Sequence, residues 1–466
     1  MSREILSTQN KALKINLNHK IFGTLAEIGG GQEVARYFFR AGGSSGTIAK
    51  SISAYDKKYS DYLYKGKAKR YVSKERLVKM LDVEYNEVVC LLDAERGEVS
   101  TFFAFANTVE TINFRKDNQG HGWLGIKFQH EPKSPPNQII MHLNLKENDT
   151  ILQQNTLGVI GINLIYAAYY YSNNIHDFLE SLMDNLTSDR LEINMLSLEG
   201  ELFKEIDNRI ISLLLVKMGY TPASVFDRDG KIQQPSDMFY KKNIMLLRGS
   251  FRPPNYVHFD MLKAGFGFFK KEVGYSRDNS LIICEITLNN LLKTQEFNEK
   301  DYLDRVNLLN EMGQNVMVSN FKEFYKLVQY MTSHTIMELR LVLGANILEK
   351  LMDDSFYVNL KGGILEAMGR LFAQNVKLYV YPYINHNKEL ITSSNFVVKK
   401  NLTHLYNFLK QEGKILDIEN VKKERLYIQS EDILKCIYYG DDKWKKMVPV
   451  FIAKRIEERK LFGCSN

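Results

Sequence analysis

The segment Leu247-Arg248-Gly249-Ser250-Phe251-Arg252-Pro253-Pro254 combines two arginines with a glycine and a hydroxyl side chain. It follows an apolar run that predicts a strand, and it precedes a pattern that predicts a helix. In open α/β sheets, ligands bind outside the carboxyl ends of the strands. Because guanidinium groups suit phosphate and carboxylate, we expect Arg248, Ser250 and Arg252 to hold an anionic ligand group. The alternative is that each arginine pairs with a neighbouring carboxylate.

A second segment, residues 29–51, has two glycine clusters around a short helical run. Glycine lets backbone N–H groups approach an anion, and a helix N-terminus adds a favourable dipole. We therefore expect Gly42, Gly43, Gly46 and Lys50 to form a second anion site. The segment is not a Walker A loop, because its Lys-Ser pair follows Gly46 about a turn too late. Tight turns packed against a sheet are the alternative interpretation.

Polar residues at other predicted strand ends and helix starts could complete the site. Glu285 lies in the strand pattern IICEITL, Asp207 begins a predicted helix, and Asn346 follows the pattern LRLVLG. We expect Glu285 or Asp207 to act as an acid/base group or a Mg²⁺ contact, and Asn346 to contact the ligand. The alternatives are an ordinary strand residue for Glu285 and a helix N-cap for Asp207.

Two further patterns leave their interpretation open. His176, Glu180 and Asp184 have a spacing that could bind a metal, but a solvated acidic helix face looks the same, so no metal ligand is assigned. Residues 50–79 contain ten basic and three acidic residues with five interleaved tyrosines. This composition suits single-stranded nucleic acid, although an exposed, solubilising arm is the preferred interpretation.

Apolar segments of five to nine residues alternate with amphipathic stretches along most of the chain, which predicts an α/β fold. We expect a largely parallel sheet with flanking helices in residues 150–396. A sheet-bearing, glycine-rich region is predicted for residues 1–149 and a small helical cap for residues 397–466. The predicted strands are Ser100–Val109, Gly122–His130, Gln138–Leu145, Arg190–Leu196, Asn243–Arg248, Leu281–Leu288, Val316–Ser319, Glu338–Leu343 and Val376–Tyr381. The main predicted helices are Asn208–Met218, Tyr256–Val273, Glu299–Met312, Phe324–Ser333 and Gly363–Ala373.

The composition is that of a globular protein: 466 residues, 44% apolar and 25% charged, with a net charge of +7. These values exclude intrinsic disorder and fibrous repeats. The four cysteines form no C-x-x-C pair and no signal peptide is visible, so we expect a cytoplasmic protein. Residues 150–175 lack charge, but their polar side chains favour a buried helix over a membrane span.

The phrases GGGQEVARYFFRAGGSSGTIAKSISAYD, RGSFRPP, LVLGANILEKL and GGILEAMGRLF resemble those of an uncharacterised bacterial protein family. Some of its members are labelled nicotinate- or nicotinamide-nucleotide adenylyltransferase, and the resemblance covers nearly the whole chain. It implies nucleotide chemistry but carries over no individual catalytic residue. From the residues we expect an enzyme, most simply a transferase, that binds a phosphorylated small molecule or nucleotide. The alternatives are a nucleic-acid or protein-binding module and a non-catalytic assembly protein.

Overall fold

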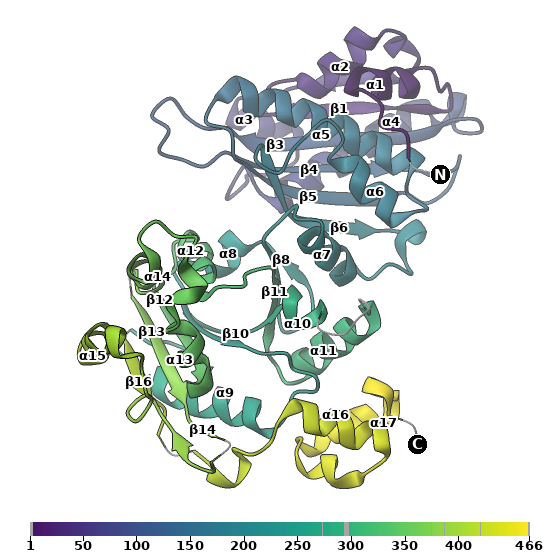
Figure 1. Ribbon diagram of the computed structural model, residues 1–466. Coiled ribbons are helices and arrows are strands. Elements are labelled where there is room, and N and C mark those ends of the chain that lie inside the picture. The colour runs from purple at the N-terminus through teal and green to yellow at the C-terminus, as the bar shows by residue number, and fades with distance from the viewer. Residues whose placement is uncertain are drawn as a thin grey trace. The chain divides into compact units, whose positions relative to one another are not determined.

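The computed structural model describes residues 3–272, 274–292, 298–373, 375–385, 387–419 and 421–464. The chain forms two compact units, Met1–Thr221 and Pro222–Asn466. Each unit has its own sheet with helices packed on it (Figure 1), which confirms the predicted α/β class. The predicted boundaries after residues 149 and 396 each lie inside a unit, so that division of the chain stays a prediction.

The sheet of the first unit has six strands in the order β2-β1-β3-β4-β5-β6. Strands β1 (Ile21–Ile28), β2 (Ile48–Ile52) and β3 (Thr101–Glu110) are parallel neighbours. Strands β4 (His121–Phe128), β5 (Asn137–Leu145) and β6 (Leu191–Glu199) continue the sheet in antiparallel fashion. Residues 190–196 were predicted as a strand of the largely parallel sheet. This part of the prediction was wrong, because β6 pairs antiparallel with β5 in the sheet of the first unit.

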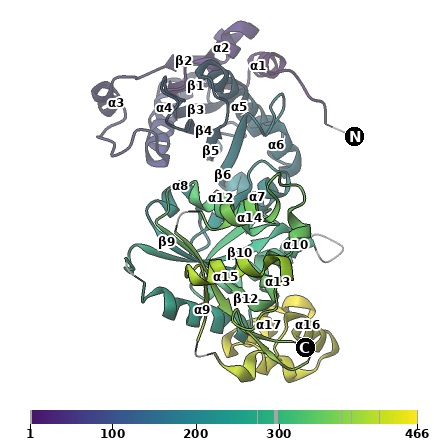
Figure 2. The ribbon, with the colours of Figure 1, turned by 60° about the vertical axis from the view of Figure 1, so that its left-hand side comes forward.

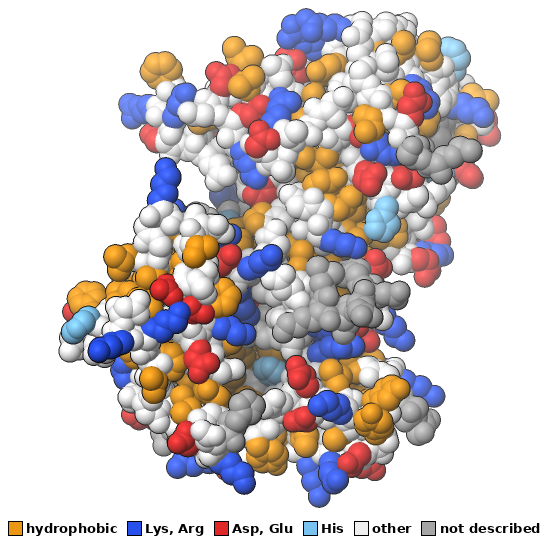
Figure 3. Space-filling model, in the orientation of Figure 1, with side chains coloured by type: hydrophobic (Ala, Val, Ile, Leu, Met, Phe, Trp, Pro, Cys, Tyr) orange, Lys and Arg blue, Asp and Glu red, His pale blue; other side chains and the backbone are white. Residues whose placement is uncertain are grey.

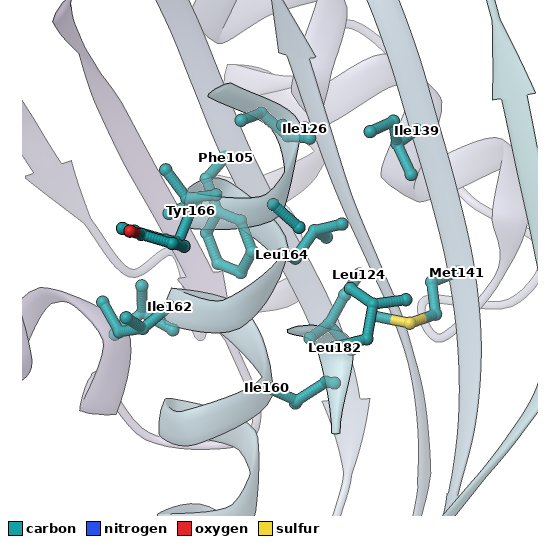
Figure 4. Packing of buried hydrophobic residues seen from close by; sticks show 14 of the residues in the cluster. Phe105, Leu124, Ile126, Ile139, Met141, Ile160, Ile162, Leu164, Tyr166 and Leu182 are labelled. Atoms are coloured by element: carbon teal, nitrogen blue, oxygen red, sulfur yellow. The ribbon is translucent and has the colours of Figure 1, made fainter. Parts of the chain in front are cut away.

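Helices cover both faces of this sheet. One face packs against α1 (Thr8–Asn16), α2 (Glu33–Ala41), α5 (Thr150–Tyr170), α6 (Ile175–Leu182) and α7 (Asn208–Lys217). The other face packs against α4 (Lys74–Arg96), which follows the short helix α3 (Lys57–Leu63). Helix α5 confirms the predicted buried helix, and its side chains lie over β3, β4 and β5 (Figure 4).

Helix α5 approaches α2 closely because it presents Gly158 and Gly161 to that helix. A Cβ atom on Gly161 would lie 2.3 Å from Cγ2 of Val34 in α2. Asp149 caps the helix by accepting a hydrogen bond from the N–H of Leu152 at 3.0 Å. The part of the chain that the structure describes contains no helix with the length and apolarity of a membrane span.

The sheet of the second unit has eight strands in the order β16-β13-β12-β9-β10-β11-β7-β8. Six are parallel: β9 (Asn243–Arg248), β10 (Ser280–Thr287), β11 (Asn315–Ser319), β12 (Glu338–Gly344), β13 (Val376–Tyr381) and β16 (Ile415–Asp417). Strands β7 (Ala223–Phe226) and β8 (Ile232–Gln233) extend one edge in antiparallel fashion. Strands β14 (Tyr383–Ile384) and β15 (Leu390–Ile391) form a separate hairpin.

The six parallel strands have a doubly wound order. Numbered along the chain, they lie in the order 3-2-1-4-5-6, so the winding reverses between β9 and β12. Helices α9 (Tyr256–Phe269), α10 (Leu288–Leu292) and α11 (Glu299–Glu311) connect the first three strands. Helices α12 (Phe324–Thr332), α13 (Ala345–Leu351), α14 (Gly363–Leu371) and α15 (Thr403–Gln411) pack on the opposite face (Figure 2).

The remaining elements are the short helix α8 (Pro235–Phe239) and two C-terminal helices, α16 (Ser430–Tyr439) and α17 (Val450–Arg459). The C-terminal helices pack around a small apolar cluster that contains Trp444 and Ile452 and also includes Leu308 of α11. The predicted strands and helices named above are confirmed with shifts of a few residues at their ends. Val273, the last residue of one predicted helix, lies outside the described residues.

Candidate functional site

The candidate site lies at the carboxyl edge of the second sheet, where the winding reverses. The loop that leaves β9 leads to α9 on one face, whereas β12 ends at Gly344 and continues directly into α13 on the other. The two strands are hydrogen-bonded neighbours, with Leu247 opposite Val342. Two of the predicted ligand contacts, Ser250 and Asn346, therefore leave the same edge of the sheet beside one another.

Arg248 and Glu285 form a buried ion pair at this edge. The guanidinium donates from Nε to Oε2 at 2.7 Å and from Nη2 to Oε1 at 2.9 Å, and the Ser319 hydroxyl donates to Oε1 at 2.6 Å. The side chain of Glu285 is fully buried, and that of Arg248 also lies over the ring of Phe324. The structure thus brings the predicted anion-binding arginine and the predicted catalytic carboxylate together, as partners of each other.

The loop after β9 is held from behind by polar side chains of α10 and α11. Nη1 of Arg305 donates to the carbonyl of Ser250 at 3.2 Å, and Nδ2 of Asn290 donates to that of Gly249 at 3.4 Å. Asp301 accepts from Nε of Arg252 at 2.7 Å and also binds Arg305. The carbonyls of this loop are therefore directed at the protein. Arg305 and Asp301 were not predicted, and no local pattern marks them.

Some backbone N–H groups of this loop have no protein partner: within the described ranges, those of Ser250, Phe251 and Arg252 donate to no protein acceptor. Phe251 has a positive φ of 47°, and the whole residue is buried, whereas Ser250 and Arg252 are partly exposed. Successive N–H groups around such a residue form an anion-binding concavity. Arg252 adds its two terminal amino groups, because only its Nε contacts Asp301.

The N-terminus of α9 is closed by the protein itself. Asn255 accepts from the N–H groups of Val257 and His258, and the ring of His258 accepts from the N–H of Asn255 at 3.2 Å. The N–H of Tyr256 donates to the carbonyl of Met447 at 3.1 Å. Burial lowers the pKa of His258 to about 4, so its ring is neutral at pH 7. An anion at this edge therefore meets the loop amides and not those of α9.

The predicted anion site of the first unit has a different geometry. Gly42, Gly43 and Gly46 form the turn from α2 into the amino end of β2, where Nδ2 of Asn16 donates to the carbonyl of Gly42 at 2.8 Å. Nζ of Lys50 pairs with Glu84 and Glu87, each at 2.7 Å. The turn lies at the edge of the sheet opposite the carboxyl ends of the parallel strands. The ammonium group of Lys50 is paired with two carboxylates.

Asp207 is the N-cap of α7 and belongs to the first unit, whereas Glu285 belongs to the second. Its carboxylate accepts from the backbone N–H of Arg209 and binds the guanidinium of the same residue at 2.6 Å. Burial by itself would raise the pKa of Asp207, but these hydrogen bonds with Arg209 hold the pKa below its usual value. Its observed contacts are those of a helix cap.

Among the described residues, no three His, Cys, Asp or Glu side chains are arranged to hold a metal ion. The open question about His176, Glu180 and Asp184 is resolved by the end of α6 at Leu182, which places Asp184 beyond the helix. There its carboxylate binds Lys11 at 2.7 Å and Arg3 at 2.6 Å.

A cavity of about 510 Å³ lies at the amino ends of β12, β13 and β16. At its centre the buried guanidinium of Arg340 binds Glu272 and Glu338. Burial by itself would raise the pKa of Glu272, but the hydrogen bonds from Arg340 and Tyr379 lower this pKa to about 2. Ligands of doubly wound sheets bind at the carboxyl ends instead, so we regard this cluster as structural.

In the first unit, a carboxylate of the protein occupies the N-terminus of α2. Glu27, near the end of β1, accepts from the N–H groups of Val34 and Ala35 in the first turn of α2 and from Nδ2 of Asn107. The carboxylate is buried, and this burial raises its pKa from 4.5 to about 7. Sequence patterns gave no sign of this role.

Comparisons with known proteins were made for the whole chain. No family model and no curated protein matches it. Three similar solved structures are the competence/damage inducible protein CihA from Agrobacterium tumefaciens, a CinA superfamily protein from Escherichia coli and a putative nicotinate-nucleotide adenylyltransferase from Vibrio parahaemolyticus. Their sequence identities are 14%, 11% and 14%, and their TM-scores are 0.26, 0.25 and 0.25. They cover 36%, 34% and 47% of this chain and 98%, 87% and 95% of their own.

We predict that Glu27→Gln changes how stability depends on pH. Because the pKa of Glu27 is raised in the folded state, the folded protein binds the carboxyl proton more tightly than the unfolded chain does. Binding of this proton therefore stabilises the fold at low pH, and the stabilisation is lost as the pH rises from about 4.5 to 7. Urea unfolding of both proteins at pH 5 and pH 8 should show that their difference in unfolding free energy shifts by about 2.5 kcal/mol, with the wild type relatively more stable at pH 5. A difference that is independent of pH would contradict this assignment.

We predict that Arg248→Met destabilises the second unit by about 3–5 kcal/mol, because it leaves the buried Glu285 carboxylate without its counter-ion. The double variant Arg248→Met/Glu285→Met should recover most of this loss, since an apolar pair has no unpaired charge. Equilibrium unfolding in urea measures both values. A single variant as stable as the wild type would show that the pair does not hold the strand ends together.

Proposed function

We propose that the second unit binds a nucleotide or another phosphorylated small molecule where β9 and β12 end, and that the protein is a transferase acting on it. The observation that carries this proposal is the reversal of the winding between β9 and β12. In doubly wound sheets a ligand crevice forms at this position, because the two following connections leave toward opposite faces.

The loop after β9 is suited to a phosphate. Its unpaired N–H groups at the partly exposed residues Ser250 and Arg252 offer fixed donors, and the terminal amino groups of Arg252 add a charge. In this proposal the Arg248–Glu285 pair positions the strand ends, because the guanidinium and the carboxylate form a bidentate ion pair with each other. Neither Glu285 nor the capping residue Asp207 is then required as an acid/base group.

Asn346 provides the contact from the other side of the crevice. It lies in the first turn of α13, its side chain is exposed, and its Oδ1 would lie 2.4 Å from a Cβ atom on Gly344. The side-chain amide of Asn346 therefore folds back over Gly344 at the end of β12, and β12 is the strand next to β9. An amide here can bind a ribose hydroxyl or a base edge by hydrogen bonds.

Nucleotidyl or phosphoryl transfer is the reaction class that this arrangement favours. Such transfers depend on positioning and on charge stabilisation at phosphate, which backbone donors and an arginine supply. The sequence resemblance to a family with members labelled nicotinate- or nicotinamide-nucleotide adenylyltransferase supports a nucleotide as the ligand. A Mg²⁺ ion would accompany the phosphates of such a ligand.

We predict that Asn346→Asp weakens binding of ATP about 5- to 10-fold. The change adds one negative charge to the crevice that holds the negatively charged phosphates, without altering the size of the side chain, and such a charge costs on the order of 1 kcal/mol. Isothermal titration calorimetry with ATP, with and without Mg²⁺, measures the effect. Asn407→Asp is the matched control, because Asn407 is also exposed and lies in the same unit on α15, the helix that precedes the edge strand β16.

The control variant should bind ATP as the wild type does. If neither ATP nor other nucleotides and sugar phosphates bind, the proposed ligand class is wrong. If both variants weaken binding equally, the ligand lies elsewhere.

A further inference from the structure

The first unit carries almost the whole net charge of the protein in one segment. Residues 55–79, here called the basic arm, contain nine basic and three acidic residues, so they hold six of the seven net positive charges. Elsewhere the signs nearly balance, and basic and acidic side chains are interspersed on the face seen in Figure 3. A concentration of one sign on 25 residues favours a negatively charged partner.

The basic arm is held in place by a few buried contacts. Arg76 donates to the Ser60 hydroxyl at 2.7 Å, to Asp61 at 3.1 Å and to the carbonyl of Gly66 at 3.2 Å. Tyr71 donates its hydroxyl to Asp61 at 2.9 Å. Its backbone carbonyl accepts from Thr108 of β3. In Figure 2, α3 and the loops beside it project from the edge of the first unit. The arm is thus an ordered surface feature.

These contacts use the acidic residues of the arm and leave its lysines in solvent. Asp61 is bound by Arg76 and Tyr71, and Asp56 caps α3 by accepting from the N–H of Tyr59. Among the described residues of the arm, six exposed lysines form no ion pair with a carboxylate: Lys57, Lys58, Lys65, Lys67, Lys69 and Lys79. Their charges are available to a ligand.

Three tyrosine rings stand among these lysines. Tyr55, Tyr59 and Tyr62 are 61%, 56% and 85% exposed, although a tyrosine ring is usually at least half-buried. The aliphatic residues Leu63 and Val72 of the arm are partly buried instead. Flat aromatic rings with cations between them suit nucleobases and phosphates, whereas an interfacial membrane helix buries a wide apolar face that is rich in Leu, Phe or Trp.

We propose that the basic arm is a binding surface for single-stranded nucleic acid, with Lys57 and Lys58 contacting phosphates and Tyr62 stacking on a base. This surface belongs to the first unit and does not depend on the nucleotide site proposed for the second. A single strand fits better than a duplex, because only unpaired bases offer their faces for stacking.

The test measures binding of a fluorescein-labelled 20-nucleotide oligo(dT) to the full chain by fluorescence anisotropy over a range of salt concentrations. Lys57→Gln/Lys58→Gln should reduce the slope of log affinity against log salt by about 1.4, since each lost phosphate contact contributes about 0.7. Tyr62→Ala should weaken binding at least about fivefold while leaving the slope unchanged.

Matched controls come from the second unit. Lys422 and Lys423 are an exposed adjacent pair, and Tyr438 is 76% exposed. Lys422→Gln/Lys423→Gln and Tyr438→Ala should leave binding unchanged. Circular dichroism confirms that each variant is folded.

Three results would overturn the proposal. One is the absence of oligo(dT) binding while vesicles containing phosphatidylserine bind, which would identify a membrane surface as the partner. Another is equal affinity for a duplex with no effect of Tyr62→Ala, which would reduce the arm to a general polyanion site. The third is an equal loss of binding in the arm variants and their controls.

Discussion

The reversal of winding between β9 and β12 is the constraint on which the second unit depends. A right-handed connection from β9 must leave toward the face of α9, and the connection from β12 must leave toward the face of α13. No helix can cover the edge between them, so their loops border an opening. The side chains around this edge are best understood by how they hold these two loops in place.

Charge at this edge is balanced mostly inside the protein. Glu285 neutralises Arg248, Asp301 is shared by Arg252 and Arg305, and the first turn of α9 is closed by Asn255 and Met447. A buried pair of this kind does not add much stability over an apolar pair, but losing one partner is costly. The donors left for a ligand are therefore the backbone N–H groups of the β9 loop and the free end of Arg252. The same principle operates in the first unit, where Glu27 occupies the N-terminus of α2.

Much of the fold could be predicted from local sequence patterns. The bounds of β9 and β13 agree with the prediction to the residue, because apolar runs that end in turn residues specify strands locally. Strand β1 was missed, although seven of its eight residues are buried, since its Gly, Thr and Glu interrupt the apolar pattern. Strand β2 was missed because its positions are mostly half-exposed and it contains a lysine.

The strand that precedes the proposed site could be predicted, but the contacts of its side chains could not. The sequence Arg-Gly-Ser-x-Arg begins at the end of a strand, as predicted, yet the partners of its arginines are Glu285 and Asp301, 37 and 49 residues further along the chain. Such pairings depend on strand order, which a local pattern does not contain. Asp207 and Lys50 belong to the other unit, where Asp207 caps α7 and Lys50 pairs with Glu84 and Glu87, so their predicted roles stay predictions.

Hydrogen–deuterium exchange of the full chain with and without saturating ATP and Mg²⁺ tests the central claim most directly. The account predicts that added protection is concentrated in residues 249–253 and 344–348, because the unpaired amides of the β9 loop become donors to the phosphates. Protection confined to other segments, while calorimetry shows ATP bound, would contradict the assignment of the ligand to the reversal between β9 and β12.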